Sequence, residues 1–260
     1  MHKHIKAVFF DIDGTLVSFK THSVPESARR AIVRLREQGI KVFIATGRLM
    51  KHVSIVEDIE VDGYITVNGG YCITASGEVI YENYFERDTV ERVISLSEEY
   101  GFALNVMTHQ DMYVNCWGER VEKIANMIHI RPTVADLRTI AASQPVVQMC
   151  PYISVDLEPE IMSQLPDCVG SRWIETFMDI NLKGVDKSLG VEQVMRYYGF
   201  TMAEAMAFGD GGNDLPMVRD AAVGVAMGNA CAELKAAADY ITTSVDEDGV
   251  EQALKYYGLI

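Results

Sequence analysis

Short apolar runs alternate with amphipathic segments over the first part of the chain. Residues 6–10 form a short apolar run rich in β-branched and aromatic side chains, typical of a strand buried on both faces of a parallel sheet. Residues 23–26 have the pattern of a capping box with an early proline and predict a helix that ends at Gly39. Residues 40–45 predict a second strand, and the segment up to residue 58 is helical in pattern. This order predicts right-handed crossovers and a parallel sheet.

The alternation changes character after a third predicted strand at residues 64–67. Two short runs on either side of Ser76-Gly77 predict a hairpin. Helices and strands then follow one another without the earlier regularity, which predicts a small α+β domain, residues 82–182, inserted into a larger one. Within it we expect helices near 88–100 and 119–128 and strands at 103–107, 112–115, 146–150 and within 168–181.

The first pattern resumes after Gly184. Asp186 is placed to cap a helix whose apolar positions continue to the stop at Gly199. The larger domain therefore consists of residues 1–81 and 183–260, and we predict the α/β fold class with ligands at the carboxyl ends of the parallel strands. Its remaining expected elements are strands at 205–208 and 223–227, a short helix between them, and closing helices after Asn229 and Asp246.

Composition and charge narrow the class of protein. The chain has 260 residues, 48% of them hydrophobic, which is enough for one large domain or two moderate ones. Its formal net charge of −14 repels nucleic acids and anionic membranes, so these partners are disfavoured. Asp11 interrupts the apolar run nearest the N-terminus, and no run approaches the ~18 to 20 apolar residues of a membrane span. The five cysteines form no CxxC and fit reduced thiols. We expect a cytoplasmic protein, with a monomer as the default state.

Aspartates follow two of the predicted strands. Asp11 and Asp13 stand at the end of the first strand, and Asp210 and Asp214 lie in the loop after the strand at 205–208. If the strand ends meet, the repulsion among four carboxylates has to be offset, and a cation with oxygen ligands and retained waters indicates Mg²⁺ rather than zinc. The alternative is that these are ordinary turn and cap aspartates. Two such loops on strands far apart in sequence favour a metal site.

Two further positions suggest anion binding. Thr46 offers a hydroxyl at the end of the second strand, and Gly47 allows close backbone approach to an anion, although the same residues could form a helix cap. Lys187 falls in the first turn of its helix, where its charge opposes the helix dipole. A solvated lysine is the ordinary explanation, and a charge aimed at a phosphate is the functional one. The chain contains no P-loop, dinucleotide fingerprint or GxSxG serine elbow.

Taken together, these motifs resemble a known family. Residues 11–15, DIDGT, match the DxDGT motif of the haloacid dehalogenase (HAD) superfamily, and Thr46-Gly47-Arg48 is similar to its second motif. Lys187 is similar to the third and 209–214, GDGGND, to the fourth. The order, spacing and flanks, including 226–230, AMGNA, resemble the Cof-type phosphatases of subclass IIB over nearly the whole chain, closest to the bacterial hexose-phosphate phosphatases.

The resemblance implies a Rossmann-like core with a mobile cap inserted between the second and third motifs. In these terms Asp11 is the nucleophile and a magnesium ligand, and Asp13 is the general acid and base with its backbone carbonyl on the metal. Asp210 is the third protein ligand, with Asp214 in reach of the metal's waters. The expected phosphate-binding residues are Thr46, Gly47, Arg48, Lys187 and Asn213, with Asn68 a further candidate near the substrate.

The implied activity is Mg²⁺-dependent hydrolysis of small phosphate monoesters, foremost hexose phosphates, through an aspartyl phosphate. A phosphosugar mutase would use the same motifs, and a non-enzymatic sugar-phosphate sensor would share the aspartate pocket. Nothing in the sequence identifies the physiological substrate. The cap residues Trp173, Glu175, Thr176 and Asp179 could face a ligand, but their alternation fits an ordinary half-buried strand equally well.

Overall fold

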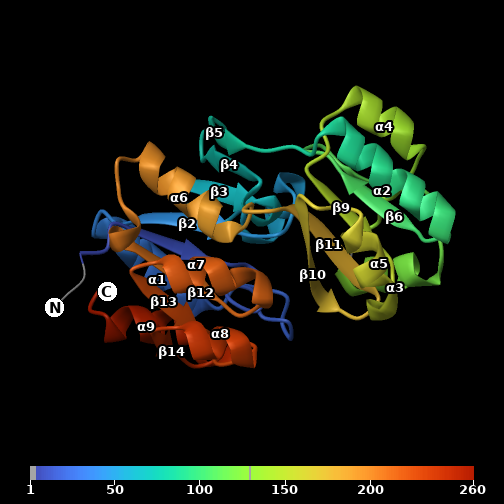
Figure 1. The fold of residues 1–260 in the computed structure, drawn as a ribbon. Helices are drawn as coiled ribbons and strands as arrows, with labels where there is room; N and C mark the ends of the chain where they lie inside the picture. The colour runs from blue at the N-terminus through green and yellow to red at the C-terminus, as the bar shows by residue number, and fades with distance from the viewer. Residues whose placement is uncertain (1–3, 129) are drawn as a thin grey trace. The chain divides into compact units, whose positions relative to one another are not determined.

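The computed structural model describes residues 4–128 and 130–260, and its chain contacts divide it into two compact units. One unit, the core, combines the chain up to Glu82 with Val185–Ile260, and the other, the cap, is Asn83–Gly184. The domain boundaries predicted from the sequence lie within two residues of these positions. Figure 1 shows the elements of each unit.

A mixed eight-stranded sheet forms the centre of the core, in the order β14-β13-β12-β1-β2-β3-β4-β5. The first six strands of this order are parallel, and β4 and β5 continue the sheet as an antiparallel hairpin. The confirmed α/β class therefore includes an antiparallel edge. The strands are β1 (Ala7–Phe10), β2 (Lys41–Ala45), β3 (Gly63–Thr66), β4 (Tyr71–Thr74), β5 (Val79–Glu82), β12 (Ala205–Gly209), β13 (Val223–Ala226) and β14 (Tyr240–Ile241).

Helices cover both faces of this sheet, which explains why its central strands are apolar throughout (Figure 1). Phe10 of β1 packs into a cluster with α1 (Glu26–Glu37) and α9 (Gly249–Tyr256). Phe9 points to the other face, toward α6 (Lys187–Tyr197), α7 (Leu215–Asp220) and α8 (Ala232–Ala237). Alternate residues of one strand thus enter separate halves of the core.

Two local predictions for the core were wrong. The residue before α1 is Pro25, no side chain caps this helix, and the Ser23 hydroxyl donates to Thr21 instead, so the capping box is absent. The segment predicted as helical up to residue 58 contains two short 3-10 helices, η1 (Met50–His52) and η2 (Ser54–Val56). The fixed φ of Pro25 suits the start of a helix without a side-chain cap.

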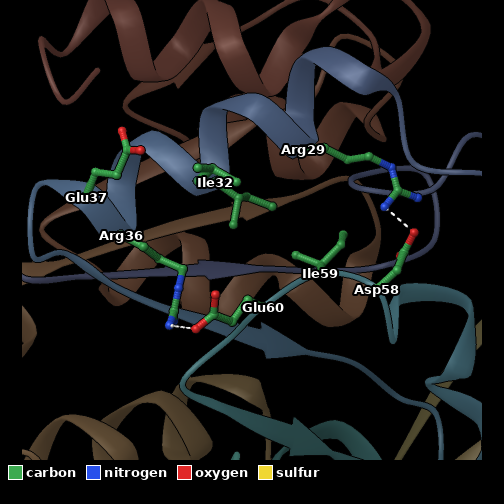
Figure 2. A pocket seen from close by; sticks show the side chains of 8 residues that line it. Arg29, Ile32, Arg36, Glu37, Asp58, Ile59 and Glu60 are labelled. Atoms are coloured by element: carbon green, nitrogen blue, oxygen red, sulfur yellow. Dashed lines mark hydrogen bonds and ion pairs between the residues drawn. The ribbon is translucent and has the colours of Figure 1, made fainter.

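The outer face of α1 borders a surface groove that Figure 2 shows. Arg29 forms an ion pair with Asp58 on one side of it, and Arg36 pairs with Glu60 on the other. These pairs tie α1 to the segment before β3. No helix among residues 4–128 and 130–260 is long and apolar enough to cross a membrane.

The cap has its own six-stranded sheet, in the order β10-β11-β9-β6-β7-β8. The predicted helices and strands of this unit are present. The sequence pattern did not predict β8 or two helices, α4 and α5, each shorter than two full helical turns. The elements are α2 (Arg87–Tyr100), β6 (Leu104–Met107), β7 (Met112–Val114), α3 (Glu119–Ile128), β8 (Thr133–Val134), α4 (Leu137–Ser143), β9 (Gln148–Pro151), α5 (Glu158–Ser163), β10 (Cys168–Ile174) and β11 (Phe177–Leu182).

Candidate active site

The register of the core sheet brings the predicted site residues to one edge. Phe10, the last residue of β1, lies opposite Phe208 of β12 on one side and Ile44 of β2 on the other. Asp11 follows the first of these strands directly, and Asp210 follows β12. The Asp11 backbone N–H donates to the Phe208 carbonyl at 3.1 Å, which extends the pairing to the point where the two loops begin. Parallel strands thus deliver aspartates from distant parts of the chain to the same place.

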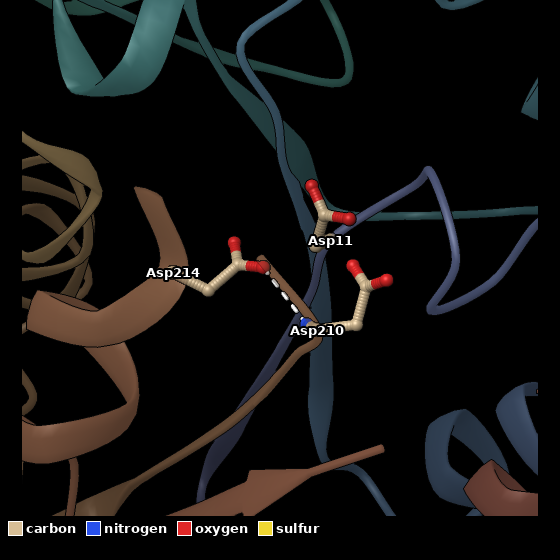
Figure 3. Close-up of side chains that lie close together, drawn as sticks. All are labelled: Asp11, Asp210 and Asp214. Atoms are coloured by element: carbon tan, nitrogen blue, oxygen red, sulfur yellow. Dashed lines mark hydrogen bonds between the residues drawn. The ribbon is translucent and has the colours of Figure 1, made fainter. Parts of the chain in front are cut away.

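Three carboxylates lie close together at this edge. Asp11, Asp210 and Asp214 each offer an oxygen within 4.8 Å of the others, and Figure 3 shows the Asp11 and Asp210 side chains next to each other. Burial, followed by the charge of Asp214, raises the pKa of Asp11 well above its usual range. The same two causes raise the pKa of Asp210 to about 7. Ionising all three groups requires positive charge nearby.

Lys187 supplies one such charge. Its ammonium is fully buried and donates to Asp11 Oδ1 and to Asp214 Oδ1, both at 2.6 Å. Burial lowers the pKa of this amine, but the two carboxylates more than offset that effect and raise it, so Lys187 stays protonated. The Asp186 side chain accepts from the Leu189 N–H and caps α6 as predicted. The solvated-lysine alternative is therefore wrong.

Asp214 is held from its other side by the loop after β12. Its Oδ2 accepts the backbone N–H groups of Asp210 and Gly211, each at 2.9 Å. A side chain on Gly209 would place its Cβ 2.4 Å from the Asp214 Cβ, so only glycine fits there. Both oxygens of Asp214 are therefore occupied by protein donors.

Asp13 does not belong to this cluster of three. Its carboxylate lies against Arg48 and accepts from two guanidinium nitrogens at 2.7 and 2.8 Å. The Thr46 side chain is buried, and its hydroxyl oxygen accepts the Arg48 backbone N–H at 3.1 Å. Thr46, Gly47 and Arg48 thus form one loop at the end of β2, as the sequence suggested.

A strained turn after β3 holds the loop that follows β2. Val67, Asn68 and Gly69 have φ values of 52°, 50° and 97°, and a positive φ is rare for a β-branched residue such as valine. The Asn68 backbone N–H donates to the Thr46 carbonyl at 3.1 Å. Its side-chain oxygen accepts from Asn213 Nδ2 at 3.0 Å. Asn68 therefore links the second and fourth motifs.

Two residues at this edge received no role from sequence. The carboxamide of Asn229 donates to the Gly14 carbonyl at 2.8 Å and to Asp210 Oδ2 at 3.0 Å, so it fixes the first loop to the fourth. In the sequence, Asn229 was marked only by its position in the motif at residues 226–230. Gly14 has a φ of 85°, and a Cβ there would lie 2.1 Å from Asp210 Oδ2. The glycine is required by the approach of that carboxylate.

The cap candidates lie around the β10–β11 hairpin. Glu175 is exposed, Thr176 is half-buried in the turn, and the Trp173 side chain lies outside the described part of the chain. Asp179 of β11 accepts a hydrogen bond from Cys150 Sγ at 3.3 Å, and burial raises its pKa to about 6. No residue of this group is assigned a role by these contacts.

The core sheet and its acidic edge define an α/β protein with a candidate cation site at the carboxyl ends of its parallel strands. A protein-family comparison matches residues 8–254 to the haloacid dehalogenase-like hydrolases. The chain belongs to this family, as its motifs indicated.

Solved structures agree in fold and in class of activity. The subclass IIB sugar phosphatase BT4131 is 39% identical with a TM-score of 0.90, and the match covers 98% of this chain and 100% of that one. The superfamily phosphatase BT1666 from Bacteroides thetaiotaomicron is 35% identical with a TM-score of 0.94, over 98% of this chain and 96% of that one. YkrA of Bacillus subtilis strain 168, whose name proposes a phosphatase, is 31% identical over 98% of each chain. The protein is a HAD-type phosphatase, a phosphoric monoester hydrolase.

Proposed function

We propose that the protein hydrolyses small phosphorylated metabolites, foremost hexose phosphates, with Mg²⁺ as cofactor and an aspartyl phosphate as intermediate. The observation that carries the proposal is the buried group of Asp11, Asp214 and Lys187 at the edge of the core sheet. The likeness to a sugar phosphatase over the full length of that enzyme supports the substrate class.

The residues at the acidic edge fit a divalent cation. Three carboxylates with a single fully buried ammonium leave an excess of negative charge, and oxygen ligands suit Mg²⁺. Asp11 and Asp210 would hold the ion, together with the Asp13 carbonyl, and Asp214 would stand behind them. A bound Mg²⁺ neutralises phosphoryl charge and favours the ionised form of Asp11.

The chain's own groups account for the transfer. The Asp11 carboxylate attacks phosphorus, and the bond from phosphorus to the ester oxygen breaks. Asp13 gives its proton to the departing alcohol and then accepts one from the water that hydrolyses the aspartyl phosphate, which releases orthophosphate. Lys187, Thr46, Asn213 and the Gly47 backbone stabilise the transferring group.

A panel of phosphorylated hexoses, pentoses, nucleotides and cofactors, assayed for orthophosphate with and without Mg²⁺, tests this function. We expect Mg²⁺-dependent release with the highest kcat/KM on a hexose phosphate. An Asp11→Asn variant should have no turnover and should still fold, with a cooperative thermal unfolding transition. A phosphosugar mutase would instead isomerise a sugar phosphate in the presence of a bisphosphate primer. Absence of orthophosphate release from every ester would contradict the proposal and favour a sensor.

A further inference from the structure

The guanidinium of Arg48 is committed to protein partners on all three nitrogens. Nη2 donates to Asp13 Oδ1 at 2.7 Å, and Nε donates to Asp13 Oδ2 at 2.8 Å. Nη1 donates to the His52 carbonyl at 3.1 Å. Two parallel bonds between a guanidinium and a carboxylate fix the orientation of both groups, which a single contact cannot do.

The backbone around Arg48 is fixed as well. Its N–H donates to the Thr46 hydroxyl, and its carbonyl accepts from the Val67 N–H at 3.1 Å. The His52 carbonyl that orients the guanidinium belongs to η1, on the same loop. The side chain is thus anchored at its base and at its tip. The side-chain bonds use three of the five guanidinium N–H donors, and the two parallel ones both go to the Asp13 carboxylate.

We infer that Arg48 is a positioning residue for Asp13 rather than a ligand of the phosphoryl group. This inference rests on the proposed phosphatase function, in which Asp13 gives a proton to the departing alcohol. It replaces the role that the resemblance implied for Arg48. The Asp13 side chain is 38% exposed and does not belong to the three-carboxylate cluster, so packing alone does not fix its carboxylate.

The need for such a partner follows from the chemistry. A general acid must lie within hydrogen-bond distance of the oxygen that it protonates, and a displacement of about 1 Å can cost on the order of 100-fold in rate. A free aspartate rotates about two side-chain bonds. The paired bonds from Arg48 restrict both rotations. Binding of the phosphoryl group is left to Lys187, Thr46 and Asn213.

The test compares Arg48→Lys and Arg48→Gln with wild type in Mg²⁺. The substrates are an alkyl phosphate that wild type hydrolyses and an aryl phosphate, whose leaving group needs no proton. We expect both variants to lose on the order of 100-fold in kcat/KM for the alkyl phosphate and clearly less for the aryl phosphate. The inhibition constant of orthophosphate should stay within twofold of wild type, a change of ~0.4 kcal/mol at most in binding free energy. The reason is that the residues that bind phosphate are unchanged in these variants.

Arg29→Lys is the matched control. Arg29 also bonds a carboxylate, that of Asp58, and a backbone carbonyl, that of Val24, in the same unit but on the groove beside α1 (Figure 2). We expect it to keep wild-type kinetics. In an Asp13→Asn background, Arg48→Lys should cause no further loss, because the residue acts only through Asp13.

Three results would overturn the inference: a much weaker inhibition by orthophosphate, an equal loss on alkyl and aryl esters, or additive losses in the double variant. Thermal unfolding separates a folding defect from a catalytic one, and the comparison of two esters within one variant is independent of the folded fraction. If wild type hydrolyses no phosphate ester, the proposed function fails. If wild type is active but Arg48 variants lose affinity for orthophosphate, only the positioning role fails.

Discussion

Replacing Lys187 by methionine removes a fully buried positive charge at the acidic edge. Methionine is similar in length and fills the apolar part of the lysine site. The ammonium contacts two carboxylates at 2.6 Å, those of Asp11 and Asp214, and no part of it reaches solvent. Breaking a buried ion pair from one side costs about 3 to 5 kcal/mol, because the remaining charge is left without a partner.

Urea unfolding in the presence of a chelator measures this cost. We expect Lys187→Met to lose about 3 to 5 kcal/mol of unfolding free energy, a large share of the stability of an ordinary domain. Adding Asp214→Asn should recover part of the loss, since one of the two unpaired charges is then absent. The control is Lys20→Met, whose ion pair with Asp246 lies at the surface, and we expect no measurable change.

Equal stability of Lys187→Met and wild type would refute this reasoning. It would mean that the buried carboxylates carry no charge for the ammonium to balance. A further loss on adding Asp214→Asn would also contradict it, because neutralising a carboxylate should then relieve repulsion.

Three more outcomes follow from the site and the cap. Gly14→Ala should lose turnover and about 1 to 3 kcal/mol of unfolding free energy in urea, because a positive φ strains alanine and its Cβ would meet Asp210; an active variant of wild-type stability would contradict this. Mg²⁺ should raise the melting temperature of wild type, and Asp210→Asn should remove most of the shift. Burial raises the pKa of Asp179 to about 6, so the folded state favours its protonated form. The unfolding free energy that this preference contributes below the ordinary pKa near 4 is lost as the pH rises through 6. In urea unfolding, the drop in unfolding free energy from pH 5 to pH 8 should therefore be smaller for Asp179→Asn than for wild type.

Strand positions in the core were the most predictable part of the structure. The runs that became β1, β2 and β12 are buried along their length, except for the half-buried Lys41 that begins β2. Such runs are distinct from the amphipathic helices between them. The short helices α4 and α5 were missed because six or seven residues contain too few turns to show a period. In the same way, the helical pattern before residue 58 could not reveal that its turns would be 3-10 helices.

The sequence by itself determined that acidic residues follow the strands and that the strands run in parallel. Those two facts place Asp11, Asp210 and Thr46 at one edge of the sheet, because parallel strands share an end. The family resemblance supplied the expected roles, and the comparisons confirmed the family.

Only the tertiary structure decided which side chains meet at that edge. Lys187 contacts Asp214 as well as Asp11, Arg48 pairs with Asp13, and Asn229 bridges two loops. The physical reason is that strand periodicity fixes where a loop begins, whereas a contact between two loops depends on their backbone path and on side-chain rotation. Those are set by packing among segments that lie 19 to 215 residues apart in these contacts, and no local pattern of residues contains them.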